Sequence, residues 1–115
     1  MIGDLPEFPD DENGDVLRRL LSRGDDLASP RIIDFCFIFP ERGQALAFAE
    51  LVDDRDLSVC ISFYEAREIW QVIVKRCMIP THEQITALEL ILAHRAESVG
   101  GNADGWGCMH VDRKV

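Results

Sequence analysis

The chain has 115 residues, of which 47% are hydrophobic and 29% are charged, and its formal net charge is −9. This length suits one folded domain that buries roughly two-thirds of its unfolded surface and needs no metal or disulfide to hold its core. The acidic balance repels nucleic acid phosphates, which argues against direct DNA or RNA binding. We expect the negative charge either to keep the protein soluble or to attract a basic protein partner.

The N-terminal residues indicate the cytoplasm, and this compartment decides how the cysteines are interpreted. Residues 1–15 contain no basic residue and no apolar run, and no stretch approaches the roughly 20 apolar residues of a membrane span. The cysteines form no C-x-x-C pair, so we predict buried free thiols in a reducing compartment rather than disulfides, at Cys36, Cys60, Cys77 and Cys108.

The first third of the chain predicts an irregular lead-in, a helix and a strand. Residues 1–9 are interrupted by two prolines, and the helix that follows is capped by Asp10 or Asp11 and ends at Gly24. Residues 31–39 alternate, and apolar residues on both faces favour a central strand. One face of this strand carries Ile33, Phe35, Phe37 and Phe39.

The middle third predicts a second helix and a hairpin. Apolar residues recur at helical spacing between residues 41 and 54, after Pro40 has ended the strand. Residues 56–65 and 68–79 then alternate in two runs, with a short link at Ala66 and Arg67.

The last third predicts the longest helix and a closing strand. Thr81 and Gln84 form a capping box, and Gly100-Gly101 supplies the left-handed end of the helix. We predict a turn over residues 102–105 and a short strand over residues 106–111. The apolar face of the helix consists of Ile85, Leu88, Leu92 and Ala96.

The order of these elements predicts an α+β domain. A helix followed by two strand–helix–strand units gives, with right-handed crossovers, a ferredoxin-like split β-α-β sandwich. Its four-stranded antiparallel sheet would carry two helices on one face, and the leading helix is an addition. Residues 1–115 would form a single domain, with no repeat and no dividing linker.

No known catalytic or metal pattern is present. If Gly14 is aligned with the glycine of a calcium loop, Pro9 and Leu20 fall at ligand positions, which excludes an EF-hand. The spacing of His82 and His94 on one helix, or of Cys108 and His110, does not make a zinc site. His82 follows a helix cap, where we expect it to be exposed to solvent. Paired carboxylates such as Asp25-Asp26 lie at the ends of predicted helices and strands, where we expect them to cap those elements and to face solvent.

Two features leave alternatives open. Trp106 begins the last strand and either closes the end of the core or stands exposed as a binding anchor. The open face of the sheet is a candidate small-molecule site, which would be lined by Asp34, Cys36, Ser58, Cys60 and Ser62. The chain is then either a protein-binding domain or a small-molecule-binding module. The sequence is compatible with a monomer and with a homodimer formed through an exposed edge strand.

Four segments together resemble a known family. FPDDENGDVLRRL, RIIDFCFIFP, KRCMIPTHEQIT and GGNADGWG, in this order and spacing, are similar to the RraB-like domain family. Its namesake is the bacterial regulator of ribonuclease E activity B. The most specific motifs are D-G-W-G (Asp104 to Gly107) and M-x-P-T-H (Met78 to His82), and the resemblance covers nearly the whole chain.

The resemblance implies a non-enzymatic protein that inhibits or modulates ribonuclease E and so affects RNA turnover. The namesake binds the non-catalytic scaffold region of ribonuclease E, and an acidic protein suits an arginine-rich scaffold because complementary charge steers encounter. We therefore expect a basic protein partner, ribonuclease E or another, and no cofactor. The predicted contact residues are Asp10, Asp11, Glu12, Asp15, Asp104, Gly105, Trp106 and Gly107.

Overall fold

The computed structural model describes residues 8–113. Most of the lead-in predicted for residues 1–9 lies outside this range. The elements in chain order are α1 (Glu12–Ser22), β1 (Arg31–Phe39), α2 (Arg42–Leu51), β2 (Ser58–Tyr64), the short 3-10 helix η2 (Glu65–Arg67), β3 (Ile69–Met78), α3 (His82–Ser98) and β4 (Asn102–Cys108).

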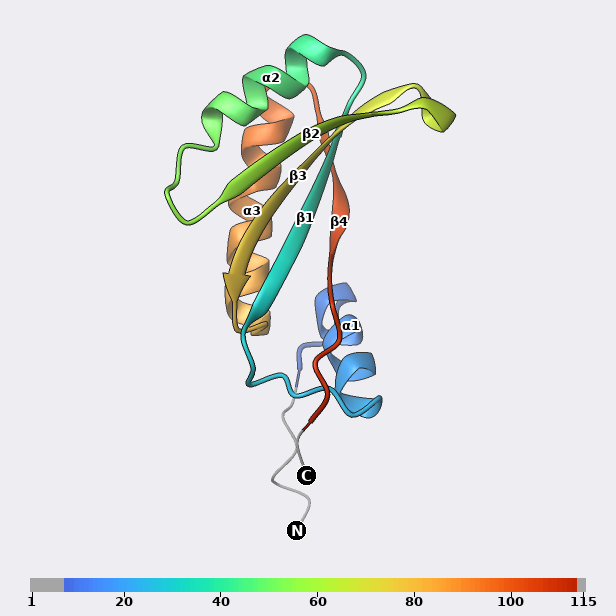
Figure 1. Cartoon of the computed structure of the whole chain (residues 1–115), viewed down its shortest axis with the longest axis vertical. Helices are drawn as coiled ribbons and strands as arrows, with labels where there is room; N and C mark the ends of the chain where they lie inside the picture. The colour runs from blue at the N-terminus through green and yellow to red at the C-terminus, as the bar shows by residue number, and fades with distance from the viewer. Residues whose placement is uncertain (1–7, 114–115) are drawn as a thin grey trace.

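The four strands form one antiparallel sheet in the order β2-β3-β1-β4. In Figure 1, α2 and α3 cover one face of this sheet, and α1 lies at the end of the sheet where β4 finishes. This is the predicted ferredoxin-like split β-α-β sandwich with an added N-terminal helix. The first strand is central, as its apolar pattern predicted, because β3 and β4 pair with it on either side.

The core lies between the sheet and the two covering helices. The face of β1 predicted to be apolar is almost fully buried, and the rings of Phe37 and Phe39 lie 5.0 and 5.2 Å from that of Phe48 on α2. The helix α3 turns its predicted apolar face to the same core. Its buried residues are Ile85, Leu88, Leu92 and Ala96.

The connection from α3 to β4 depends on two glycines. Gly100 has a φ of 88°, a left-handed conformation that glycine adopts without strain. Gly101 is buried, and a Cβ at this position would overlap the ring of Phe39. The helix end predicted at these two glycines is confirmed.

The turn predicted over residues 102–105 is wrong, because these residues already belong to β4. The strand pairs with β1 from Ile38↔Asn102 onward, and its register shifts between Phe35 and Phe37. Gly105, with a φ of 93°, lies within this shift. An Asp-Gly pair therefore serves a β-bulge here rather than a turn, since a bulge also requires a left-handed glycine.

Candidate functional site at the junction of α1, α3 and β4

The first turn of α1 is fixed by Asp11 and Gly14. Asp11 is the N-cap, and its Oδ1 accepts a hydrogen bond from the Gly14 amide at 2.7 Å. Gly14 is buried, and a Cβ there would overlap the carbonyl oxygen of Pro9. This tight approach accounts for a glycine inside a helix, where it otherwise costs stability.

The same Asp11 carboxylate joins α1 to the start of α3. His82 Nε2 lies 2.9 Å from Asp11 Oδ2 and 3.1 Å from Oδ1. The hydrogen bond from Gly14, followed by that from His82, holds the pKa of Asp11 below its usual value. The expectation that His82 is solvent-exposed was wrong: its side chain is 19% exposed, because α1 covers it.

Asn13 connects α1 to both α3 and β4. Its Nδ2 donates to Thr86 Oγ1 at 3.0 Å and to Glu89 Oε1 at 3.2 Å, both on α3. Its Oδ1 accepts a hydrogen bond from Trp106 Nε1 on β4 at 2.8 Å. We call these contacts, together with the Asp11–His82 pair, the α1 clasp.

The position of Trp106 lies between the two alternatives left by the sequence, and a role as a binding anchor stays a prediction. Its ring is half-buried and packs against the edge of the core, while its N–H binds Asn13. The side chain therefore attaches α1 to the sheet. An amphipathic ring with one satisfied polar atom suits such a boundary.

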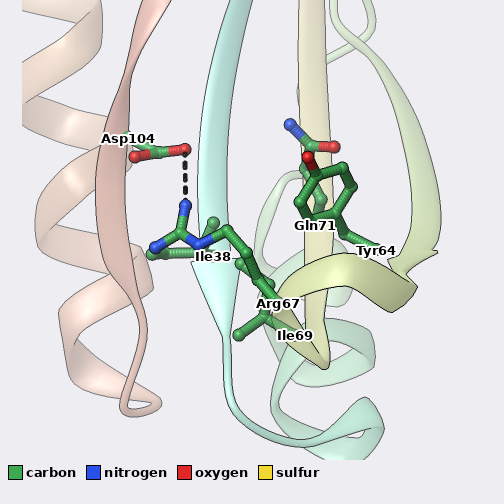
Figure 2. Close-up of a pocket in the computed structure, with 6 residues that line it drawn as sticks. All are labelled: Ile38, Tyr64, Arg67, Ile69, Gln71 and Asp104. Carbon is green, nitrogen blue, oxygen red and sulfur yellow. Dashed lines mark ion pairs between the residues drawn. The ribbon is translucent and has the colours of Figure 1, made fainter.

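The other side of β4 carries Asp104. Its carboxylate lies 4.0 Å from the guanidinium of Arg67, which reaches over from the tip of the β2–β3 hairpin (Figure 2). The two side chains border a groove of about 280 Å³ that is also lined by Ile38, Tyr64, Ile69 and Gln71. The eight predicted contact residues thus lie in two places: Asp10, Asp11, Glu12 and Asp15 at the start of α1, and Asp104, Gly105, Trp106 and Gly107 along β4. Trp106 connects the two places through Asn13.

Comparison with family models identifies the chain. Residues 10–108 match the model of the family RraB, described as regulator of ribonuclease activity B. The chain belongs to this family. A comparison with curated proteins found no match.

The RraB match extends from the start of α1 to the end of β4, and so contains the whole clasp. The motifs that suggested the family from the sequence meet there: Asp11 and Asn13 from the first segment, His82 from M-x-P-T-H and Trp106 from D-G-W-G. The family consists of regulators of ribonuclease activity. In this chain the residues of these motifs hold α1 against α3 and β4.

A buried ion pair that the sequence patterns did not indicate joins the segment after α1 to the start of β1. Asp25 and Arg31 are 0% and 6% exposed, and Arg31 Nη1 lies 2.8 Å from Asp25 Oδ2. The prediction that Asp25 caps the end of an element and faces solvent was therefore wrong. The amide of Val111 and the ring of His110 also approach Asp25 Oδ2, at 3.1 and 3.3 Å, so that this carboxylate anchors the segment after β4.

The ionisation of Asp25 follows from these neighbours. Burial raises the pKa of a carboxyl group, but the hydrogen bonds from Arg31 and from the Val111 amide outweigh it here and lower the pKa of Asp25. The signal available in the sequence was the arginine that starts a buried strand, six residues after an aspartate.

The four cysteines are free thiols, as predicted, but they are not buried in the core. Cys60 and Cys77 are exposed, and Cys36 and Cys108 are half-buried. Burial raises the pKa of the Cys36 and Cys108 thiols, which disfavours the nucleophilic thiolate form. Cys60, Cys77 and Cys36 lie on the uncovered face of the sheet, where no helix packs.

Neither a metal-binding cluster nor a membrane-spanning helix is found among residues 8–113. Within this range no group of three or more His, Cys, Asp or Glu side chains is placed to hold a metal ion. No helix in the same range is both long and apolar enough to cross a membrane. The five residues predicted for a small-molecule site do share the open face of the sheet, and a ligand for them stays a prediction.

Proposed function

We propose that this protein regulates a ribonuclease by binding a basic segment of it, with ribonuclease E as the candidate partner. The proposal rests on membership of the RraB family and on the charge of the surface at the clasp. It assigns no catalytic step to the chain, and it takes the protein to act in the cytoplasm, where the ribonuclease meets its RNA.

The observation that carries the proposal is the contact between Asp11 and His82. It brings the N-termini of α1 and α3 together, and both helices carry acidic residues in their first turns. Asp10, Glu12 and Glu83 are exposed there and make no ion pair within residues 8–113. We call these three residues the acidic corner.

Three other carboxylates at this end of the molecule are already engaged. Asp15 pairs with Arg18, Asp11 pairs with His82, and Glu89 accepts a hydrogen bond from Asn13. The acidic corner is therefore the part of this surface that offers uncompensated charge to an arginine-rich partner, and such charge speeds and orients association. In this proposal Trp106 acts by holding α1 in place through Asn13.

Acidic residues at helix N-termini also stabilise their own helices, because they complement the helix dipole. A test must therefore separate binding from folding. Neutral isosteres at the acidic corner, Asp10→Asn, Glu12→Gln and Glu83→Gln, remove the charge with little change of shape. The triple variant Glu50→Gln, Glu65→Gln and Glu97→Gln removes the same charge from exposed positions elsewhere and is the matched control.

The experiment is a calorimetric titration of the ribonuclease E scaffold region with the wild type and with both triple variants. Exposed charge contacts contribute about 0.5 kcal/mol each, so the corner variant should bind roughly tenfold more weakly. The control variant should bind like the wild type. Equal affinities of the two variants for the scaffold region would show that the acidic corner is not the binding surface. A wild type that does not bind would show that ribonuclease E is not the partner.

A further inference from the structure

The face of the sheet turned away from α2 and α3 is uncovered by any element in residues 8–113 (Figure 1). The strand registers place alternate residues of β1, β2 and β3 on it. Among these positions the charged side chains are Asp34 and Lys75, which form an ion pair of 3.2 Å near the middle of the face. The other positions are apolar or small and polar, and Ile32 and Tyr64 are 55% and 48% exposed.

The charge of this face differs from that of the whole chain. Three of the carboxylates that line its grooves are each paired with a positively charged side chain: Asp34 with Lys75, Asp56 with Arg76, and Asp104 with Arg67 (Figure 2). Glu68 and Arg55 add one charge of each sign at its margins, so the charges along these grooves balance. The chain as a whole carries −9. A basic partner is therefore attracted to the acidic corner and gains little from this face, whereas two copies of an acidic chain can approach each other best where each is neutral.

We propose that the open face binds a second copy of this chain, in a dimer whose two-fold axis passes close to the Asp34–Lys75 pair. In a two-fold interface each residue meets its counterpart reciprocally, so the surface must complement itself. Asp34 of one copy facing Lys75 of the other, and the reverse, satisfies this requirement. Ile32 and Ile73 supply apolar area beside the charges, and Tyr64 supplies more toward the β2–β3 hairpin.

The size of the face suits a weak dimer. Four strands about 4.8 Å apart and about eight residues long at roughly 3.3 Å each give a face of about 19 by 26 Å. Its projected area is roughly 500 Å², and the accessible area of the side chains is larger. Specific interfaces bury about 800 Å² on each partner, and weaker ones less. We therefore expect a dimer whose formation depends on protein concentration in the micromolar to millimolar range.

Charge reversal followed by mixing tests the reciprocal pairing. Asp34→Lys gives a face with two positive charges, and Lys75→Glu gives a face with two negative charges, both at side chains about 40% exposed in the wild type. In sedimentation equilibrium the wild type should dimerise and each variant alone should stay monomeric. An equimolar mixture of the two variants should recover the dimer mass.

Two exposed positions on the helices provide controls. Glu97→Lys on α3 and Arg19→Glu on α1 change the net charge by the same amounts and should dimerise like the wild type. Circular dichroism of every variant checks that it is folded. A wild type that stays monomeric up to millimolar concentration overturns the proposal, as does a reversed variant that dimerises normally, or a mixture of folded variants that does not associate.

Salt dependence separates this dimer from the proposed ribonuclease contact. Binding of a basic segment to the acidic corner should weaken as salt rises. Self-association should depend less steeply on salt, because screening weakens the reciprocal Asp34–Lys75 pairs but also weakens the repulsion between two chains of charge −9. Either proposal can fail while the other stands, since they use different faces of the molecule.

Discussion

The indole N–H of Trp106 donates a hydrogen bond of 2.8 Å to the side-chain oxygen of Asn13, across 93 positions of sequence. This contact joins the added helix α1 to the last strand of the sheet. It also brings together two of the segments by which the sequence resembles the family.

Removal of the indole N–H should weaken the attachment of α1. Trp106→Phe keeps an aromatic ring but leaves Asn13 Oδ1 without its donor, and we expect a loss of about 1 kcal/mol in the free energy of unfolding. Asn13→Ala removes the contacts to Thr86 and Glu89 as well and should cost more, about 2 kcal/mol. Urea unfolding of both single variants and the double variant gives the coupling energy, and a coupling of zero would show that the bond does not stabilise the fold.

The hydrogen bonds that Asp11 accepts, first from the Gly14 amide and then from His82, predict a loss of stability in acid. The pKa of Asp11 is lower in the folded chain than in the unfolded chain, so its contribution is present above the unfolded pKa and is lost as pH falls through the folded value. Asp11→Asn retains a good N-cap residue but cannot titrate. Urea unfolding between about pH 5 and pH 3 should show a smaller decrease for Asp11→Asn than for the wild type. Identical slopes would contradict this role.

Removal of one member of the buried Asp25–Arg31 pair should strongly lower the free energy of unfolding. Arg31→Met leaves a buried carboxylate without its guanidinium, and we expect a loss of about 3–5 kcal/mol in unfolding free energy. The double variant Asp25→Leu, Arg31→Met removes both charges and should be more stable than the single variant. A single variant as stable as the wild type would show that the pair is dispensable.

The two glycines that flank Trp106 should respond differently to alanine. Gly105 has a φ of 93°, so Gly105→Ala should cost roughly 1–2 kcal/mol. Gly107 has no such φ, and a Cβ there would meet no atom within 4 Å, so Gly107→Ala should be nearly neutral for stability. Thermal unfolding of the two variants compares them directly, and equal losses would argue against the bulge.

The sequence predicts the fold through patterns that are local. The N-cap at Asp11, the buried face of β1, the four core residues of α3 and the glycine end of that helix all follow from periodicity and capping chemistry within a few residues. Local patterns also place the four strands in order, because the right-handed crossover rule leaves few topologies.

The clasp could not be predicted, because its contacts join residues more than 70 positions apart. The structure uses Asn13 as a connector to α3 and β4, and Gly14 for close packing against Pro9. The burial of Asp25 and the exposure of Cys60 were missed for a related reason. Both depend on which surfaces other elements cover, and alternation along one strand does not contain that information.

The most direct test of the proposed function is the cleavage of an RNA substrate by full-length ribonuclease E as this protein is added. The account predicts that the wild type slows cleavage, that the control variant at Glu50, Glu65 and Glu97 does so equally, and that the variant neutralised at Asp10, Glu12 and Glu83 needs roughly tenfold more protein for the same effect. Cleavage that is unchanged by the wild type, or slowed equally by all three proteins, would contradict it.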